Sequence, residues 1–388
     1  MIGRRYFSTI GFALAVSLML GCGGCRTNSK SSGDEPLKIG ADLTLTGPTA
    51  YWSQQIKKGL DLAVEAANTH SGPRPIQVLY QDNQSNQGQA VSIFQRFATI
   101  DQVSVVITCF TPIAKPLRNN AANEQLPLVA TVVSALDFGS ANEWSFRDFP
   151  PQDQQATVLA RYSYQKLGLR KVVSLVVNDD YGRDGDTAFR AEFAKLGGEG
   201  LRSETMQQTD TNVRPQITKI LGDSPDGVLV IVRDNALGIA VKQLREAGFK
   251  GRIVGVNAFD APVVWRAAGN AGEGVVFTSA YIDFAGDKEA REFLNAYKTR
   301  YKEEPDWVAC YGYTIGQYLV DLLRKSGGDR EKLRQALASL DQNSIRGRLR
   351  MSEKREVLSP IGIYEYRDGE KRLVTRLDPP TVSGKEAP

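Results

Sequence analysis

Residues 39–68 read IGADLTLTGPTAYWSQQIKKGLDLAVEAAN and contain an apolar run, a polar turn and an amphipathic segment. The apolar run, 37–45, is short and ends in turn residues, which predicts a buried strand. In the segment 53–69, apolar residues recur every three or four positions, which predicts a helix. Its apolar face consists of Ile56, Leu60, Ala63, Val64 and Ala67. A strand followed directly by a helix is the repeating unit of α/β proteins.

The same alternation continues up to residue 150. We predict strands at 76–80, 103–108 and 126–130, and helices at 88–100 and 113–124. Strands that alternate with helices form a parallel sheet with helices on both faces. Two prolines in FRDFPPQDQQ, residues 146–155, then interrupt the pattern. We place the first domain boundary there, between residues 150 and 151.

A second α/β unit follows the prolines. We predict helices at 153–167, 184–197, 213–221 and 236–248, and strands at 171–177, 201–206, 226–232, 252–256 and 273–283. Three further helices are expected at 287–303, 307–327 and 329–340. The tail, 360–377, alternates apolar and polar residues around Asp368 and Gly369, which predicts a β-hairpin. Because an isolated hairpin is marginally stable, its strands must join an existing sheet.

The N-terminal residues have the organisation of a bacterial export signal. Residues 1–21 contain two arginines, Arg4 and Arg5, followed by an apolar run and small residues. MLGC, residues 19–22, resembles a lipoprotein signal, so we predict that Cys22 carries a lipid. Cys25 lacks the apolar residue three positions before it, and an ordinary signal peptide is the alternative. Residues 22–35 are mostly small and polar, which predicts a flexible tether.

The composition excludes several classes of function. The chain has 388 residues, a formal net charge of +4 and one histidine. It has no long basic run, which argues against a nucleic-acid partner. Phosphate-loop, dinucleotide and common hydrolase motifs are absent, so we expect no cofactor, no metal and no enzymatic activity. Cys109 and Cys310 are interpreted as buried thiols, with a disulfide as the alternative.

Polar and aromatic residues follow the predicted strands. In open α/β sheets, ligands bind beyond the carboxyl ends of the strands. Hydroxyls and amides at a helix N-terminus suit a carboxylate, and aromatic rings can enclose a flat or apolar body. The segments at these places are TGPTAYW (46–52), TCFTPI (108–113), TVVSAL (131–136), NDDYG (178–182), RDNA (233–236) and VNAFDA (256–261). They predict a site for a small molecule.

The chain resembles the leucine/isoleucine/valine-binding (branched-chain amino acid) family of periplasmic solute-binding proteins, which serve ABC transporters. The resemblance is carried by residues 39–68 and by LPLVATVVS, NDDYGRDG and AVKQLREAGFKGRIVGV. It implies the type I periplasmic binding protein fold, with two Rossmann-like lobes, parallel sheets and three hinge crossovers. The N-terminal lobe would comprise 36–150 and 281–345, and the C-terminal lobe 151–280 and 346–388.

The resemblance also implies where the ligand binds. Trp52 falls at an aromatic wall, and Thr111 at the hydroxyl that meets the ligand carboxylate, with Cys109 and Phe110 beside it. Val133 and Ser134 fall at the opposite carboxylate-binding turn, and Tyr181 closes on the ligand from the second lobe. Arg233 or Asp234 falls at a further polar contact.

One position departs from the pattern of amino-acid binders. Asn257 stands where those proteins have an acidic residue for the ligand ammonium, and an amide cannot supply that charge. Asp234 or Asp260 could substitute for it. Otherwise, we expect a carboxylate or amide ligand without an α-ammonium group.

The predicted function is that of a solute-binding lipoprotein, anchored in the bacterial cell envelope and facing the periplasm or the cell exterior. It would capture an amino acid or a related small polar carboxylate or amide by hinge closure and deliver it to an ABC permease. The alternative is a ligand-sensing or ligand-independent interaction protein of the envelope on the same fold.

Overall fold

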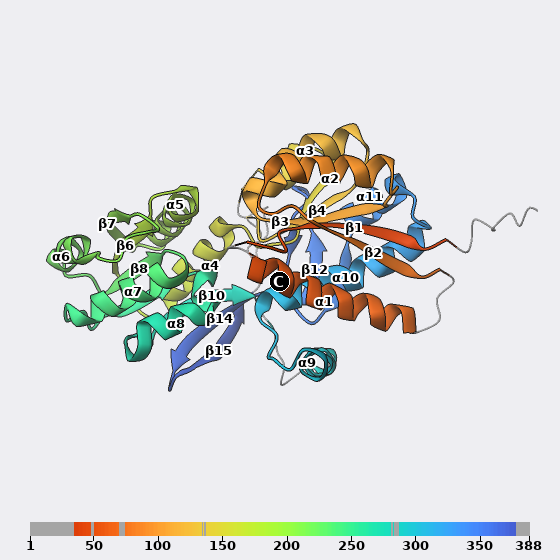
Figure 1. The fold of residues 1–388 in the computed structure, drawn as a ribbon. Helices are drawn as coiled ribbons and strands as arrows, with labels where there is room; N and C mark the ends of the chain where they lie inside the picture. Colours follow the sequence, from red (N-terminus) through yellow and green to blue (C-terminus); the bar gives the residue numbers. More distant parts are fainter. Residues whose placement is uncertain are drawn as a thin grey trace, which may run out of the picture.

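The computed structural model describes residues 35–47, 50–69, 74–133, 135, 137–280, 282 and 287–377. The predicted export signal, Cys22 and the predicted tether up to residue 34 lie outside these residues. Within the described chain, two α/β units lie side by side, and a small third sheet accompanies the first unit (Figure 1).

The first unit contains a five-stranded sheet in the order β2-β1-β3-β4-β5, and every neighbouring pair in it is parallel. This confirms the parallel sheet predicted from the alternation. The short strand β5 was not predicted. The elements are β1 (Leu37–Leu43), α1 (Ala50–Thr69), β2 (Ile76–Asp82), α2 (Gln87–Thr99), β3 (Val105–Cys109), α3 (Thr111–Asn123), β4 (Leu128–Thr131), η1 (Gly139–Ala141) and β5 (Ser145–Arg147).

The second unit contains a seven-stranded sheet in the order β15-β14-β10-β9-β8-β6-β7. Strands β6 to β10 pair in parallel, whereas β14 pairs antiparallel with both β10 and β15. The elements are α4 (Gln152–Gln165), β6 (Lys171–Val177), α5 (Asp180–Lys195), β7 (Glu199–Met206), α6 (Arg214–Gly222), β8 (Gly227–Ile231), α7 (Asp234–Glu246), β9 (Arg252–Gly255), η2 (Asn257–Asp260), α8 (Pro262–Ala268), η3 (Gly269–Gly272) and β10 (Val276–Ala280).

The tail hairpin completes this second sheet. It consists of β14 (Ile361–Arg367) and β15 (Glu370–Leu377). Asp368 and Gly369 between them have φ of 56° and 81°, the left-handed pair that a tight hairpin turn requires. The predictions of a hairpin at this turn, and of its joining an existing sheet, are therefore confirmed.

Three helices return to the first unit: α9 (Lys288–Tyr301), α10 (Trp307–Ser326) and α11 (Arg330–Ala338). Helix α10 packs on α1 with almost no space between the backbones, because glycines meet there. A Cβ atom at Gly312 would overlap the carbonyl oxygen of Ile56, and one at Gly59 would overlap that of Ala309. The two helices and the sheet beneath them enclose a core that includes Leu60, Ile315 and Leu319.

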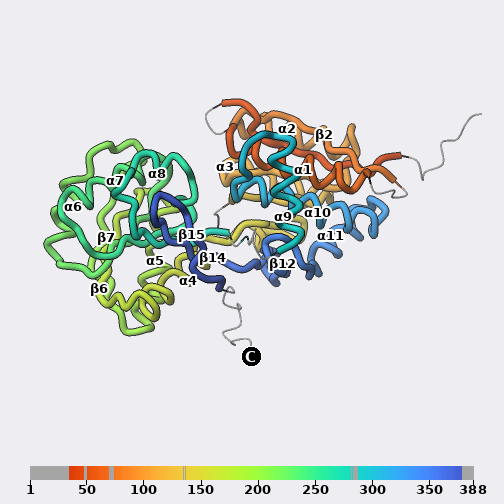
Figure 2. Tube along the Cα trace, turned by 90° about the horizontal axis from the view of Figure 1, so that it is seen from below, coloured from red at the N-terminus to blue at the C-terminus, as the bar shows by residue number. Residues whose placement is uncertain are grey.

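The small third sheet corrects one predicted boundary. It is formed by β11 (Asp341–Ser344), β12 (Gly347–Met351) and β13 (Val357–Leu358), and it was not predicted. Leu349 and Val357 pack into the same core as Leu37 and Ile39 of β1. Figure 2 shows β12 beside the first unit and β14 beside the second. Residues 346–358 therefore belong with the first lobe, and the return to the second follows Leu358.

Among the helices that begin earlier than predicted, α5 and α7 carry candidate site residues of the second lobe. Helix α5 starts at Asp180 rather than at residue 184, because the Asp179 side chain caps it by accepting a hydrogen bond from the amide of Gly182 at 3.1 Å. Helix α7 starts at Asp234 rather than at 236. Tyr181 and Asp234 therefore lie in first helical turns rather than in loops.

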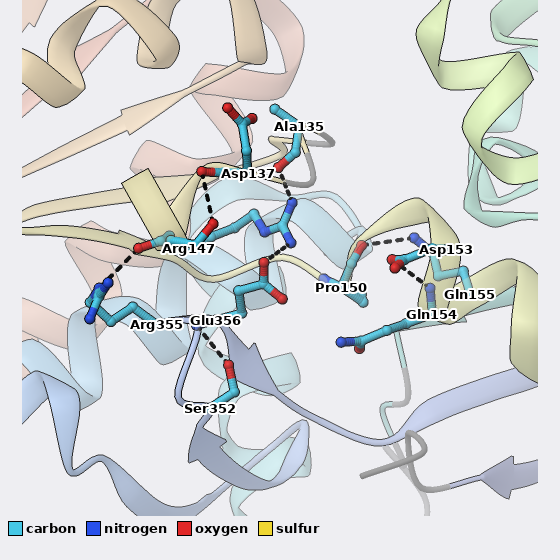
Figure 3. Close-up of polar contacts among 12 residues, drawn as sticks. Ala135, Asp137, Arg147, Pro150, Asp153, Gln154, Gln155, Ser352, Arg355 and Glu356 are labelled. Carbon is cyan, nitrogen blue, oxygen red and sulfur yellow. Dashed lines mark hydrogen bonds and ion pairs between the residues drawn. The ribbon is translucent and has the colours of Figure 1, made fainter. Parts of the chain in front are cut away.

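Two buried ion pairs join the first crossover between the units to the third sheet. Arg147, at the end of β5, pairs with Glu356 and also donates a hydrogen bond to the carbonyl of Ala135 (Figure 3). The next residue, Asp148, accepts two hydrogen bonds from Nη2 of Arg346, at 2.9 and 2.7 Å. The four charged side chains are at most 5% exposed. Because a buried charge is costly without its partner, these pairs hold the two segments together.

Candidate ligand-binding site

The first-lobe side of the candidate site is the sharp turn between β3 and α3. Phe110 precedes α3 with φ of 68°, and its carbonyl accepts hydrogen bonds from the amides of Ile113 and Ala114. This left-handed backbone is uncommon outside glycine. The turn places Thr111 at the first position of α3. There, with Gln87, Pro112, Lys115 and Pro116, it lines a pocket of about 330 Å³. The predicted hydroxyl thus borders an open space next to the starts of α2 and α3.

Cys109 lies behind this turn rather than on its surface. Its side chain is completely buried, and its Sγ lies 3.1 Å from the hydroxyl of Ser53. Burial raises the pKa of the Cys109 thiol to about 12, so the group stays protonated. Cys310 is also free and buried. Both cysteines are therefore buried thiols as interpreted from the sequence, and the alternative of a disulfide between them is wrong.

The second predicted turn of the first lobe follows β4. The side chain of Val133 is fully buried in the core beneath α2 and α3, together with Phe94 and Leu117. It therefore faces the interior of the lobe, and only its backbone can face a ligand. Ser134 lies outside the described residues.

Trp52 lies where the two lobes meet. It is partly buried and packs both against the core of the second unit and against a smaller core around β1 and β3. Its ring centroid lies 5.9 Å from that of Trp307, which in turn lies 5.7 Å from those of Phe149 and Tyr311. These three aromatic residues were not predicted at the site. They come from two distant parts of the chain, so no local pattern connects them with Trp52.

The second-lobe side contains Tyr181, Asp179 and Arg233, which follow β6 and β8. Arg233 forms an ion pair with Asp179, and its guanidinium lies 4.7 Å from the centre of the Tyr181 ring. Burial alone would raise the pKa of Asp179, but hydrogen bonds from Arg233 and from the Gly182 amide lower it. Burial raises the pKa of Tyr181 above its ordinary value, so its hydroxyl stays neutral. The three side chains therefore form one connected group.

The acidic substitutes proposed for Asn257 behave differently from each other. Asp260 is buried and already paired, since it accepts hydrogen bonds from Ser279 and Lys371. Asp234 is exposed, has φ of 53° and forms no ion pair with any described residue. The Asn257 Oδ1 atom is buried and finds no hydrogen-bond donor among the described residues. Asp260 is thus occupied, while Asp234 remains open to a ligand.

Gln152 is a candidate that the sequence did not reveal. It is the first residue of α4 and is only 1% exposed. Its amide lies near the Tyr181 hydroxyl, whose pKa burial raises and this amide partly lowers, but neither amide atom makes a well-aligned hydrogen bond to a described residue. It packs against the helix α5 that carries Tyr181, because a Cβ at Gly185 would meet its side chain. A buried amide without partners normally finds water or a ligand. The only sequence signal was its place directly after two prolines.

No cluster of three or more histidine, cysteine, aspartate or glutamate side chains within the described ranges could hold a metal ion. In the same part of the chain, we find no helix that is both long and apolar enough to cross a membrane.

Comparisons with known proteins identify a shared family and fold. A family model described as periplasmic binding protein matches residues 36–371. The Leu/Ile/Val-binding protein homolog 3 of Brucella melitensis is 24% identical over 345 residues, which are 86% of this chain and 92% of that protein.

Solved structures show the same architecture. A branched-chain amino acid transporter substrate-binding protein from Streptococcus pneumoniae, in complex with isoleucine, has a TM-score of 0.78 at 23% identity and covers 89% of this chain and 100% of its own. A solute-binding protein of an ABC transporter from R. palustris, in complex with benzoate, has a TM-score of 0.75 at 22% identity and covers 89% and 97%.

Proposed function

The chain belongs to the periplasmic binding protein family, and we propose that it is the solute-binding protein of an ABC transporter. The match confirms the family resemblance and the fold class predicted from the sequence. The family consists of substrate-binding proteins, so the prediction that the chain is not an enzyme is also confirmed.

The proposed ligand is a small solute that carries a carboxylate. The observation that carries this proposal is the position of Thr111 and Tyr181. Each lies in the first turn of the helix that follows a buried parallel strand, one in each lobe. Ligands of open α/β sheets bind at such edges. Isoleucine and benzoate occupy two proteins of the same fold. The polar group that these two ligands have in common is a carboxylate. This favours a carboxylate contact at Thr111.

Capture would occur by hinge closure. The chain passes between the two sheets from β5 to α4, from β10 to α9 and from β13 to β14. Three short crossovers allow the lobes to rotate while each keeps its own core. A ligand that contacts Thr111 on one lobe and Tyr181 on the other would stabilise the closed form, because only that form offers both sets of contacts.

The proposed location is the bacterial cell envelope, facing the periplasm or the cell exterior, with a lipid on Cys22. A lipid at this position would keep the receptor beside a membrane permease. The test is incorporation of radiolabelled palmitate into the full chain. We expect Cys22→Ser to lose the label and Cys25→Ser to keep it.

The function is tested by calorimetry on the folded chain without its export signal. The panel contains amino acids, small monocarboxylates, dicarboxylates and amides, and small-angle scattering before and after ligand addition measures closure. We expect at least one compound to bind and to reduce the radius of gyration. If no compound binds, the transport role is rejected in favour of a ligand-independent interaction role on the same fold.

A further inference from the structure

We infer that the solute is a small dianion, such as a dicarboxylate, and that Lys115 of the first lobe and Arg233 of the second each receive one of its acidic groups. This inference rests on the proposed function and names its class of substrate. Two observations support it. Each of the two sheets has a cationic side chain beyond the ends of its strands, and most of the acidic side chains nearby already have a cationic partner.

The first cation shares the pocket with Thr111. Lys115 lies one helical turn after Thr111 on α3, and residues four apart lie on the same helix face. Both line the pocket of about 330 Å³ beside the start of α2. Lys115 is exposed and forms no ion pair within the described part of the chain. Asp137, a nearby carboxylate, pairs instead with Arg118 at 3.0 Å. The ammonium is therefore available to an anion that binds at Thr111.

The second cation is held in a fixed orientation with donors to spare. One nitrogen of the Arg233 guanidinium is bonded to Asp179, and the Tyr181 ring lies against its face. Its backbone is fixed by Gln208, whose amide donates to the Arg233 carbonyl at 2.8 Å. The side chain is 35% exposed. A guanidinium has five N–H donors, and among the described residues only Asp179 accepts from this one, so a carboxylate can still bind it.

A zwitterionic amino acid suits this edge less well. Its ammonium would need a carboxylate, but Asp179 is paired with Arg233, Asp260 with Lys371, and Asn257 is neutral. An amino acid would have to bind through Asp234, which is exposed, or through Asp306 before Trp307, whose Oδ2 atom has no hydrogen-bond partner among the described residues. A ligand with one carboxylate would also leave either the Lys115 ammonium or the spare N–H donors of Arg233 without an acceptor when closure removes water, which is costly. A dianion satisfies both.

The test compares ligands that differ by one acidic group. Calorimetry on the folded chain uses benzoate against terephthalate, butyrate against glutarate, and leucine. We expect each dianion to bind at least tenfold more tightly than its matched monoanion and than leucine. Lys115→Gln and Arg233→Gln should each reduce the preference for a dianion over its matched monoanion to less than threefold. Thermal unfolding of both variants checks that they are folded.

One further variant serves as a control. Arg183→Gln removes an exposed arginine of α5 that pairs with Asp180, and it should leave the preference for dianions unchanged. Asp234→Asn is a second test rather than a control, because Asp234 belongs to the candidate site, and it should tighten dianion binding by removing a negative charge next to Arg233. If leucine or a monoanion binds as tightly as the dianions, the inference is overturned and the transport function stands. If no ligand binds, both the inference and the proposed transport function are rejected.

Discussion

The Arg147 guanidinium and the Glu356 carboxylate form an ion pair although 209 residues separate them in the chain. Their side chains are 0% and 5% exposed. The backbone supports the pair, because the amide of Arg147 donates to the carbonyl of Arg355 at 2.9 Å. The pair thus fastens the end of β5, where the chain leaves the first lobe, to the loop between β12 and β13, shortly before it leaves that lobe again.

Removing one partner of this pair should destabilise the protein strongly. Glu356→Ala leaves the Arg147 charge buried and unpaired, and we expect it to lower the free energy of unfolding by about 3–5 kcal/mol. Urea unfolding followed by circular dichroism measures the change. The matched control is Asp341→Ala, which breaks an exposed pair with Arg348 and should cost about 1 kcal/mol or less. Equal losses in the two variants would contradict the prediction.

Asp42 should make the stability depend on pH. Its side chain is buried, accepts a hydrogen bond from Asn83 at 2.9 Å, and has a second oxygen without a described partner. Burial raises the pKa of Asp42 from 3.8 to about 7 in the folded state. The folded chain therefore binds a proton that the unfolded chain releases, and stability falls as pH rises through this window.

Asp42→Asn removes this titration while keeping an acceptor for Asn83. At pH 4 the variant and the native chain should be similarly stable. At pH 8 the variant should be more stable, with a limit of about 4 kcal/mol set by the size of the shift. Urea unfolding at a series of pH values gives the difference. Asp321→Asn, at an exposed position of α10, is the control for the loss of one carboxyl group. A flat difference for Asp42→Asn would show that this carboxyl does not titrate in the window.

The contact between α1 and α10 should not accept a single added methyl group. Gly312→Ala places a Cβ onto the carbonyl of Ile56, so we expect a loss of about 1–3 kcal/mol or more from forced separation of the helices. Gly222→Ala, at the end of α6, meets no atom within 4 Å and should stabilise by up to about 1 kcal/mol. Thermal unfolding compares the two variants, and opposite signs are expected.

The strands and helices of this fold follow from local patterns. The apolar run that becomes β1, the face of α1 and the Asp368–Gly369 turn depend on residues close together in the chain, so periodicity and turn chemistry reveal them. The third sheet does not. Its short strands have few buried residues, and β12 takes its place through contacts of Leu349 with the core of the first lobe.

The residues of the candidate site also divide into those that local patterns indicate and those that only the folded structure brings together. Thr111, Tyr181 and Arg233 could be proposed as site residues because each follows a predicted strand. Gln152 and Trp307 could not, because their positions beside other site residues arise only when the folded chain brings them together. Val133 and Cys109 show a related limit. Cys109 ends β3 and Val133 follows β4. Whether a side chain at such a position faces the solvent or the core depends on the turn after it.

Thr111 and Tyr181 should each be needed for ligand binding. Thr111→Ala removes the hydroxyl beside the first-lobe pocket, and Tyr181→Ala removes the ring against which Arg233 lies. We expect each change to weaken binding at least tenfold, about 1.4 kcal/mol, measured by calorimetry with the tightest ligand of the panel. Tyr181→Phe separates the two roles of the tyrosine, because it keeps the ring for Arg233 and removes only the hydroxyl.

The control for these variants is Thr218→Ala, which removes an exposed hydroxyl of α6 that donates to the Arg214 carbonyl at 3.0 Å. It should bind the ligand as the native chain does. If Thr111→Ala and Tyr181→Ala also keep native affinity while remaining folded, then the ligand does not lie between the edges of the two sheets. If only Tyr181→Ala weakens binding, the first-lobe contact is made by backbone amides at the start of α3, which the alanine would leave in place.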